Sequence, residues 1–85
     1  MPLQLVIVTP QKSILDVEVD SVVSPGSEGQ FGVLPGHERL LAPLQEGILE
    51  YTQAGRSVRL RVTGGFADVQ PDRVTVLADA AEPAA

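Results

Sequence analysis

The chain has 85 residues, no cysteine and a formal net charge of −5 at pH 7. A chain of this length closes a single hydrophobic core, so we expect one domain. The absence of cysteine excludes disulfide bonds and thiolate metal sites. The negative charge argues against general nucleic-acid binding, which depends on clustered lysine and arginine.

The N-terminal residues predict a buried strand rather than a membrane segment. Residues Leu3 to Thr9, like residues 73–78, are rich in leucine, valine and isoleucine, which is typical of a strand that is covered more fully than a half-buried one. The sequence starts without a basic leader, and its apolar run LQLVIV is too short for a signal peptide or for a membrane span of about 20 residues. We therefore expect membrane association only through another protein.

The next segment, LDVEVD at residues 15–20, alternates apolar and acidic residues and predicts a half-buried strand. Asp16, Glu18 and Asp20 share one face, which raises the possibility of a calcium site. Same-face neighbours on a strand are about 6.6 Å apart, so the outer two carboxylates lie about 13 Å apart. They cannot share an ion whose ligands lie at about 2.3–2.6 Å, and a solvated strand face is favoured.

The segment from Pro25 to Leu44, PGSEGQFGVLPGHERLLAPL, is dominated by glycine and proline. Glycine permits left-handed or bulged backbone and proline fixes φ, so the segment predicts one tightly folded loop system with a defined surface. The part ERLLAPLQEG contains helix-forming residues, but Pro43 interrupts them. A short strand or an irregular segment is expected there.

The last third of the chain predicts further strands. Residues 58–63 alternate apolar residues with Arg59, Arg61 and Thr63, as in a half-buried strand. If an acidic strand lies beside them, the two arginines are cross-strand partners, which we favour over a docking patch. Residues 73–78 are again rich in valine and follow a predicted turn at residues 71–72, Pro-Asp.

These patterns predict an all-β fold. No window shows the apolar spacing of a helix, whereas turn signals recur at short intervals. We expect a small β-sandwich of about ten short, mostly antiparallel strands. Residues 1–79 are expected to form this domain, and residues 80–85, where alanine dominates, a short tail.

The sequence offers little material for a reaction centre. His37 is the only histidine, so a zinc site would need carboxylates that the pattern does not gather. No serine lies in a strained G-x-S-x-G turn. The glycines of GSEGQFG match neither the dinucleotide-binding fingerprint nor the phosphate-binding P-loop. We expect no catalytic residue, no bound cofactor and no metal.

Two blocks of the sequence resemble the epsilon subunit of the F-type ATP synthase. The first, PGSEGQFGVLPGHERLL, is similar to the family's Gly-x-Glu-Gly segment, then Gly-x-x-Pro-Gly-His, then a Leu-Leu pair. The second, TGGFADVQPDRVTVLADAAE, is similar to the family's Gly-Gly-Phe, acidic-Val and Val-Thr-Val-Leu-Ala-Asp ending. The matching residues are Gly26, Glu28, Gly29, Gly32, Pro35, Gly36, His37, Leu40, Leu41, Gly64, Gly65, Phe66, Asp68, Val69, Val74 and the run to Asp79.

The resemblance implies a ten-stranded β-sandwich that does no chemistry. In the family this domain sits on the rotor, where it touches the gamma subunit and the polar loops of the membrane ring of c subunits. It couples rotation of the ring to the gamma shaft that drives ATP synthesis. Carried over by position, Thr9 and Ala42 lie near gamma, and Glu28, Gln30 and His37 face the c ring. The resemblance also implies a peripheral place at the cytoplasmic face of the bacterial inner membrane. From the strand periods and the single-domain length, we expect the isolated chain to be monomeric.

The sequence departs from the family pattern in two places. Family members usually continue into a C-terminal helical hairpin, which restrains ATP hydrolysis in many bacteria and binds ATP in some. The sequence ends at Ala85, so it does not support the inhibitory role, and we expect no ATP binding. Many relatives carry an acidic residue where this chain has Gln30, so we expect contact with the ring through hydrogen bonds and shape more than through charge.

Two other classes of protein are open alternatives. A free-standing β-sandwich that binds a protein, a peptide or a carbohydrate has the same fold without the rotor. Carbohydrate binding usually needs exposed aromatic residues, and only Phe31, Tyr51 and Phe66 are present. A small hydrolase or lyase is the third reading, which the lack of a convergent polar cluster disfavours.

Overall fold

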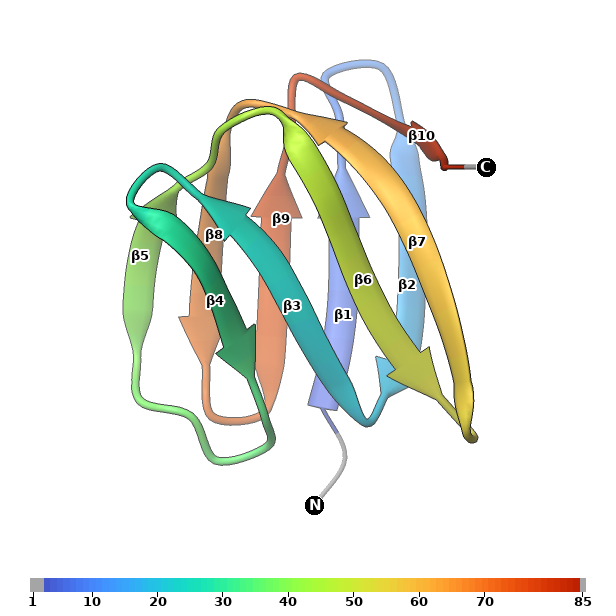
Figure 1. Cartoon of the computed structure of the whole chain (residues 1–85), viewed down its shortest axis with the longest axis vertical. Coiled ribbons are helices and arrows are strands. Elements are labelled where there is room, and N and C mark those ends of the chain that lie inside the picture. The colour runs from blue at the N-terminus through green and yellow to red at the C-terminus, as the bar shows by residue number, and fades with distance from the viewer. Residues whose placement is uncertain (1–2, 85) are drawn as a thin grey trace.

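Two five-stranded sheets face each other in the computed structural model, which describes residues 3–84 (Figure 1). The described residues contribute these strands: β1 (Leu3–Val8), β2 (Ser13–Val19), β3 (Ser21–Gly26), β4 (Gly29–Val33), β5 (Leu40–Pro43), β6 (Gly47–Gln53), β7 (Arg56–Thr63), β8 (Phe66–Gln70), β9 (Arg73–Leu77) and β10 (Ala80–Pro83). The predicted all-β sandwich of about ten short strands is confirmed. Within residues 3–84, no helix has the length and apolar character needed to cross a membrane.

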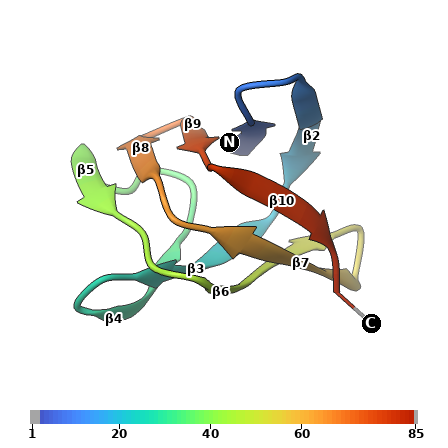
Figure 2. The same ribbon diagram turned by 90° about the horizontal axis from the view of Figure 1, so that it is seen from above.

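The two layers are clearest from above (Figure 2). Sheet A has the strand order β2-β1-β9-β8-β5, and sheet B has the order β10-β7-β6-β3-β4. Strands β1 and β9 run parallel, and the other neighbouring strands are antiparallel. The edge strands β4 and β5 lie on the same side of the sandwich, and β2 and β10 lie on the other (Figure 1).

The core lies between the sheets, because every second residue of a strand points inward. Leu5 of β1 and Val76 of β9 have no exposed surface, and Leu60 of β7 is 8 % exposed, so all three point inward. Burying such a side chain stabilises the fold by about 1.5–3 kcal/mol. The buried apolar residues are Leu3, Leu5, Ile7, Val19, Val22, Val33, Leu44, Leu49, Tyr51, Leu60, Val62, Ala67, Val69, Val74, Val76 and Ala78.

The predicted half-buried strand at residues 15–20 is confirmed as part of β2. Asp16 and Glu18 are exposed, while Val17 is half-buried and Val19 is buried. The two carboxylates therefore lie on a solvated face, and Asp20 follows the end of the strand. The Gln4 side-chain amide donates a hydrogen bond to the Asp16 carboxylate across the β1–β2 pair.

The segment 25–44 is more regular than the predicted loop system. Its first residues close β3, a two-residue turn leads into β4, and its last part contains β5. The glycines concealed these strands, because a residue without a side chain shows no period of two. Gly26 is required for packing, since a Cβ there would lie 2.9 Å from the ring of Phe31 and 2.7 Å from the carbonyl oxygen of Gly29.

The alanine-rich segment also differs from expectation. Residues 80–83 form β10 and pair with β7, from Ala80 opposite Thr63 to Pro83 opposite Leu60. The sandwich therefore extends past residue 79, and residues 80–83 are part of it rather than a tail. Because alanine has a low strand propensity, the composition of this segment did not predict a strand. Met1, Pro2 and Ala85 lie outside the described residues.

Candidate functional site

The side chains with catalytic potential do not converge. His37 lies in the β4–β5 loop, where its Nδ1 donates to the carbonyl oxygen of Glu38 at 2.6 Å. Within residues 3–84, no three His, Cys, Asp or Glu side chains are placed to hold a metal ion. The hydroxyl of Ser24 is fully buried without a hydrogen-bond partner. It lies on β3 opposite Phe31, inside the sandwich rather than at a surface.

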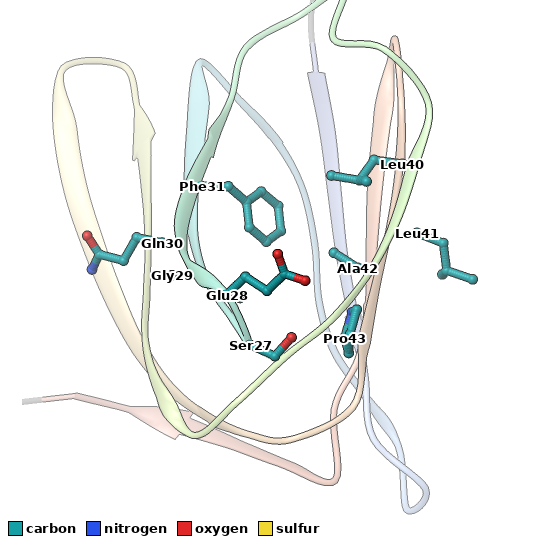
Figure 3. Close-up of a pocket in the computed structure, with 10 residues that line it drawn as sticks. Ser27, Glu28, Gly29, Gln30, Phe31, Leu40, Leu41, Ala42 and Pro43 are labelled. Carbon is teal, nitrogen blue, oxygen red and sulfur yellow. The ribbon is translucent and has the colours of Figure 1, made fainter.

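A cleft of about 340 Å³ opens between β4 and β5, on one side of the sandwich. The two-residue turn Ser27–Glu28 forms one end of it and is held by a hydrogen bond from the Ser27 amide to the carbonyl oxygen of Pro43, 3.0 Å long. Figure 3 shows Phe31 and Leu40 pointing into the cleft and the Glu28 carboxylate lying between the two strands. The cleft is therefore apolar, with Glu28 as its one charged lining residue in the part of the chain that the structure describes.

The three residues carried over to the c ring do not form one cluster. Glu28 and Gln30 are exposed near the start of β4, and the Gln30 side chain points away from the cleft (Figure 3). His37 is half-buried in the loop at the other end of β4. That loop is anchored, because the Gly36 amide donates to the carbonyl oxygen of Pro71 at 2.7 Å. The sequence predicted a loop system that includes both Gln30 and His37, whereas Gln30 belongs to strand β4 itself.

The two residues carried over to gamma lie near the same end of sheet A. Thr9 is 8 % exposed, and its hydroxyl donates to the carbonyl oxygen of Lys12 at 3.2 Å, so this side chain stabilises the β1–β2 turn. Ala42 is half-buried and lines the cleft. Across sheet A, Ala42 lies opposite Ala67, Ala67 opposite Val76, and Val76 opposite Ile7. Ala42 is therefore level with Ile7, two residues before Thr9.

Sequence reasoning missed an apolar row on the outer face of sheet A. Pro43, Phe66, Leu77 and Val8 occupy successive register positions on β5, β8, β9 and β1, and we call these four residues the apolar row. Phe66 is 50 % exposed and Leu77 is 52 % exposed. Leu41, on the same outer face of β5, is 67 % exposed. Contiguous exposed apolar side chains typically mark a surface that binds another protein.

Leu3 to Thr9 and residues 73–78 were predicted to be covered more fully than the half-buried strands, and for β1 this is confirmed, since none of its residues is exposed. Sheet B covers their inner residues, but the outer residues Val8 and Leu77 are half-buried and exposed, respectively. An apolar run in both registers of a strand normally indicates two covered faces. In β9 the outer face is not covered by the other described residues, since Leu77 is 52 % exposed.

The arginines of β7 pair as predicted. Arg59 lies opposite Glu50 of β6, with Nε 3.6 Å from Oε1, and Arg61 lies 3.9 Å from the carboxylate of Glu46. The interpretation as cross-strand partners is confirmed. Because both pairs are exposed to solvent, each contributes less than about 1 kcal/mol to stability.

These features define a class of protein: a small all-β sandwich domain with an exposed apolar sheet face and, among residues 3–84, no three His, Cys, Asp or Glu side chains placed to hold a metal ion. Residues 2–84 match the sequence model of the β-sandwich domain of the ATP synthase delta/epsilon chain. The chain belongs to this family.

Individual relatives agree with the family. The chain is 51 % identical over 84 residues to the ATP synthase epsilon chain of Herpetosiphon aurantiacus, covering 99 % of this chain and 62 % of the relative. It is 50 % identical over 82 residues to the epsilon chain of Granulibacter bethesdensis, covering 95 % of this chain and 61 % of the relative. The chain thus spans about three fifths of the length of these relatives.

Solved structures show the same fold. A chain of the Euglena gracilis mitochondrial ATP synthase, in a structure of OSCP, F1 and the c ring, superposes with a TM-score of 0.91 at 30 % identity. The match covers 96 % of this chain and 53 % of that one. A chain of the Tetrahymena thermophila central stalk and c ring superposes with a TM-score of 0.81, covering 98 % of this chain and 67 % of that one. At 16 % identity this second match supports the fold alone.

Proposed function

We propose that this chain is a non-catalytic central-stalk subunit of an F-type ATP synthase, which couples rotation of the c ring to the gamma subunit in proton-driven ATP synthesis. Support comes from its family and from epsilon-chain relatives of about one-half identity. The Euglena match comes from an assembly that contains F1 and the c ring. In this proposal the chain is peripheral, at the cytoplasmic face of a bacterial membrane, and its membrane association runs through the other subunits.

The apolar row is the observation that carries the proposal. Its two ends are adjacent in sequence to the residues assigned to gamma, since Val8 precedes Thr9 and Pro43 follows Ala42. Gamma would therefore cover the row, with Phe66 and Leu77 at its centre. Thr9 would act through the turn that it stabilises, which presents Pro10 and other exposed residues. A stiff sandwich docked by one apolar face is suited to transmitting rotation without chemistry of its own.

The ring contact is proposed at the turn that carries Glu28, together with Gln30. Gln30 is neutral, so hydrogen bonds and shape dominate and the salt dependence is shallow. His37 lies beyond the far end of β4, and the four residue-to-residue steps from position 30 to position 34 alone span about 13 Å of extended chain. A contact that includes His37 as well would therefore have to run along the whole β4 edge.

Cysteine cross-linking in the assembled synthase tests the ring contact. We expect Gln30→Cys to form a disulfide with a cysteine in the polar loop of the c subunit, and the linked enzyme to lose proton-coupled ATP synthesis. Arg56→Cys, at the exposed β6–β7 turn, is the control and should not cross-link. A cross-link from His37→Cys but not from position 30 would move the contact to the other end of β4. No cross-link from either position, with assembly intact, would remove both residues from the interface.

A further inference from the structure

Strand β4 is an edge strand without the usual protection against pairing. Exposed edges are normally blunted by charged residues, by proline or by being very short. Strand β2 carries two carboxylates, and β5 and β10 are four residues long and end in proline. Strand β4, with the sequence GQFGV, has five residues and neither charge nor proline. It is the edge of sheet B most open to another strand.

The backbone hydrogen-bonding groups of Gln30 and Gly32 in β4 point out of the sheet edge. The Gln45 amide donates to the carbonyl oxygen of Pro25, so that carbonyl points away from β4. Pro25 lies opposite Gln30, and opposing residues of an antiparallel pair alternate between bonded and non-bonded pairs. The N–H and C=O groups of Gln30, and by the same alternation those of Gly32, therefore point out of the sheet edge.

The cleft beside this edge determines which side chains fit. Phe31 points into it, and Leu40 and Ala42 line its opposite wall (Figure 3). The Glu28 side chain comes from the turn that precedes Gly29, and its carboxylate lies between the two strands (Figure 3). A strand added to β4 would thus place alternate side chains first against apolar groups and then beside a carboxylate.

We propose that β4 binds an extended segment of a partner protein, which adds an antiparallel strand to sheet B and carries the pattern apolar-x-basic. The residue opposite Phe31 faces the cleft and is apolar. Two residues later along an antiparallel strand, the residue opposite Gly29 faces the same side and is basic, beside Glu28. Backbone bonds to Gln30 and Gly32 supply affinity, and the two side chains supply specificity.

Charge complementarity favours a different protein over a second copy of this chain. Strand β4 has no basic residue to place beside Glu28 of another copy. The cleft volume of about 340 Å³ lies at the small end of the range for small-molecule sites, about 300–1,000 Å³. Both this proposal and the proposed ring contact use Glu28 and Gln30, but the peptide experiment needs neither gamma nor the c ring, so its outcome is separate from that of the proposed function.

Peptide binding to the 85-residue chain tests the proposal. The probe is acetyl-Thr-Ile-Thr-Arg-Thr-amide, and the control is the reversed peptide, acetyl-Thr-Arg-Thr-Ile-Thr-amide, which has the same composition. Titration followed by NMR should shift the amide resonances of Gln30 and Gly32 and slow their hydrogen exchange. The reversed peptide should bind about five-fold more weakly, since its basic and apolar side chains are exchanged. Equal or tighter binding of the reversed peptide overturns the proposal.

Two further comparisons test the backbone bonds and the charge. N-methylation of the central threonine of the peptide removes an N–H that faces Gln30, whereas N-methylation of the isoleucine alters one that faces away. Only the first should weaken binding, by about five-fold, and equal effects would refute strand addition. Glu28→Gln should weaken the arginine peptide by about two- to five-fold. Gln30→Pro should abolish binding while Gln30→Ala retains it, because the Gln30 N–H is outside the β3–β4 ladder.

Discussion

Replacing Gly65 by alanine tests the packing of sheet A most severely. Gly65 lies between β7 and β8 with a φ of +103°, a conformation that alanine resists. A Cβ built on it would lie 1.9 Å from the carbonyl oxygen of Leu77 and 2.9 Å from Cα of Ala78. Both are backbone atoms, so no side-chain rotation relieves the overlap. The Gly65 carbonyl also accepts the Leu44 amide at 2.9 Å, which restrains the turn from the other side.

The cost of Gly65→Ala has two parts. The positive φ costs about 1–2 kcal/mol for an L residue, and overpacking adds about 1–3 kcal/mol. We expect a loss of about 3 kcal/mol or more. Gly55→Ala is the matched control, because Gly55 has a φ of +79° and nothing lies within 4 Å of its Cβ position. It incurs the conformational cost alone, about 1 kcal/mol after the entropy lost by the unfolded chain is counted.

Urea unfolding followed by far-ultraviolet circular dichroism measures both losses. An 85-residue domain has a stability of about 4–13 kcal/mol, so both variants should retain a measurable transition. The dependence of unfolding free energy on urea should be unchanged, since the exposed surface is the same. Equal losses for Gly65→Ala and Gly55→Ala would refute the reasoning, because they would show that the contact with the Leu77 carbonyl is relieved at no cost.

Three further predictions use the same assay. Val76→Ala, at a position with no exposed surface, should cost about 2–4 kcal/mol. Leu41→Ala, at 67 % exposed, should change the stability by less than about 0.5 kcal/mol; similar losses for the two variants would contradict this assignment of the inner and outer faces of sheet A. Ala54→Asn should raise the free energy of unfolding by about 0.5–1 kcal/mol, because Ala54 in the β6–β7 turn has a φ of +50°, which asparagine tolerates better than alanine. A loss of stability would contradict this prediction. Arg59→Ala should lower the stability by less than about 1 kcal/mol, and by no measurable amount in 1 M salt, because the ion pair of Arg59 with Glu50 is exposed to solvent. A larger loss, or one that does not depend on salt, would show that Arg59 stabilises the fold by packing.

The fold was predictable where side chains alternate visibly. The residues around Val17 and around Leu60 show a period of two, and their strands were predicted from it. Strands β4 and β10 were not, because glycine and alanine carry too little side chain to show which residues point inward. The pairing of strands distant in sequence is not visible in a local pattern either; Ala80 of β10, for example, pairs with Thr63 of β7 in sheet B.

The candidate site was predictable only in part. The glycine-rich sequence predicted a tightly folded segment with a defined surface around Glu28. The structure adds the cleft that the turn of Glu28 forms with β5. The distance between Gln30 and His37 was not accessible, because a strand between them was read as a loop. The apolar row depends on the register of four strands, which aligns Phe66 with Leu77 and Pro43, and no single segment reveals it.

Binding to the gamma subunit is the most direct test of the proposed role. We expect calorimetry with gamma from the same source to show one chain bound per gamma. Serine at both Phe66 and Leu77 should weaken this binding at least about tenfold, since two large apolar side chains leave the interface. Serine at Arg59, on the opposite sheet, should leave it unchanged. Absence of a complex, or equal binding by the double variant, would contradict the account and favour a free-standing interaction module.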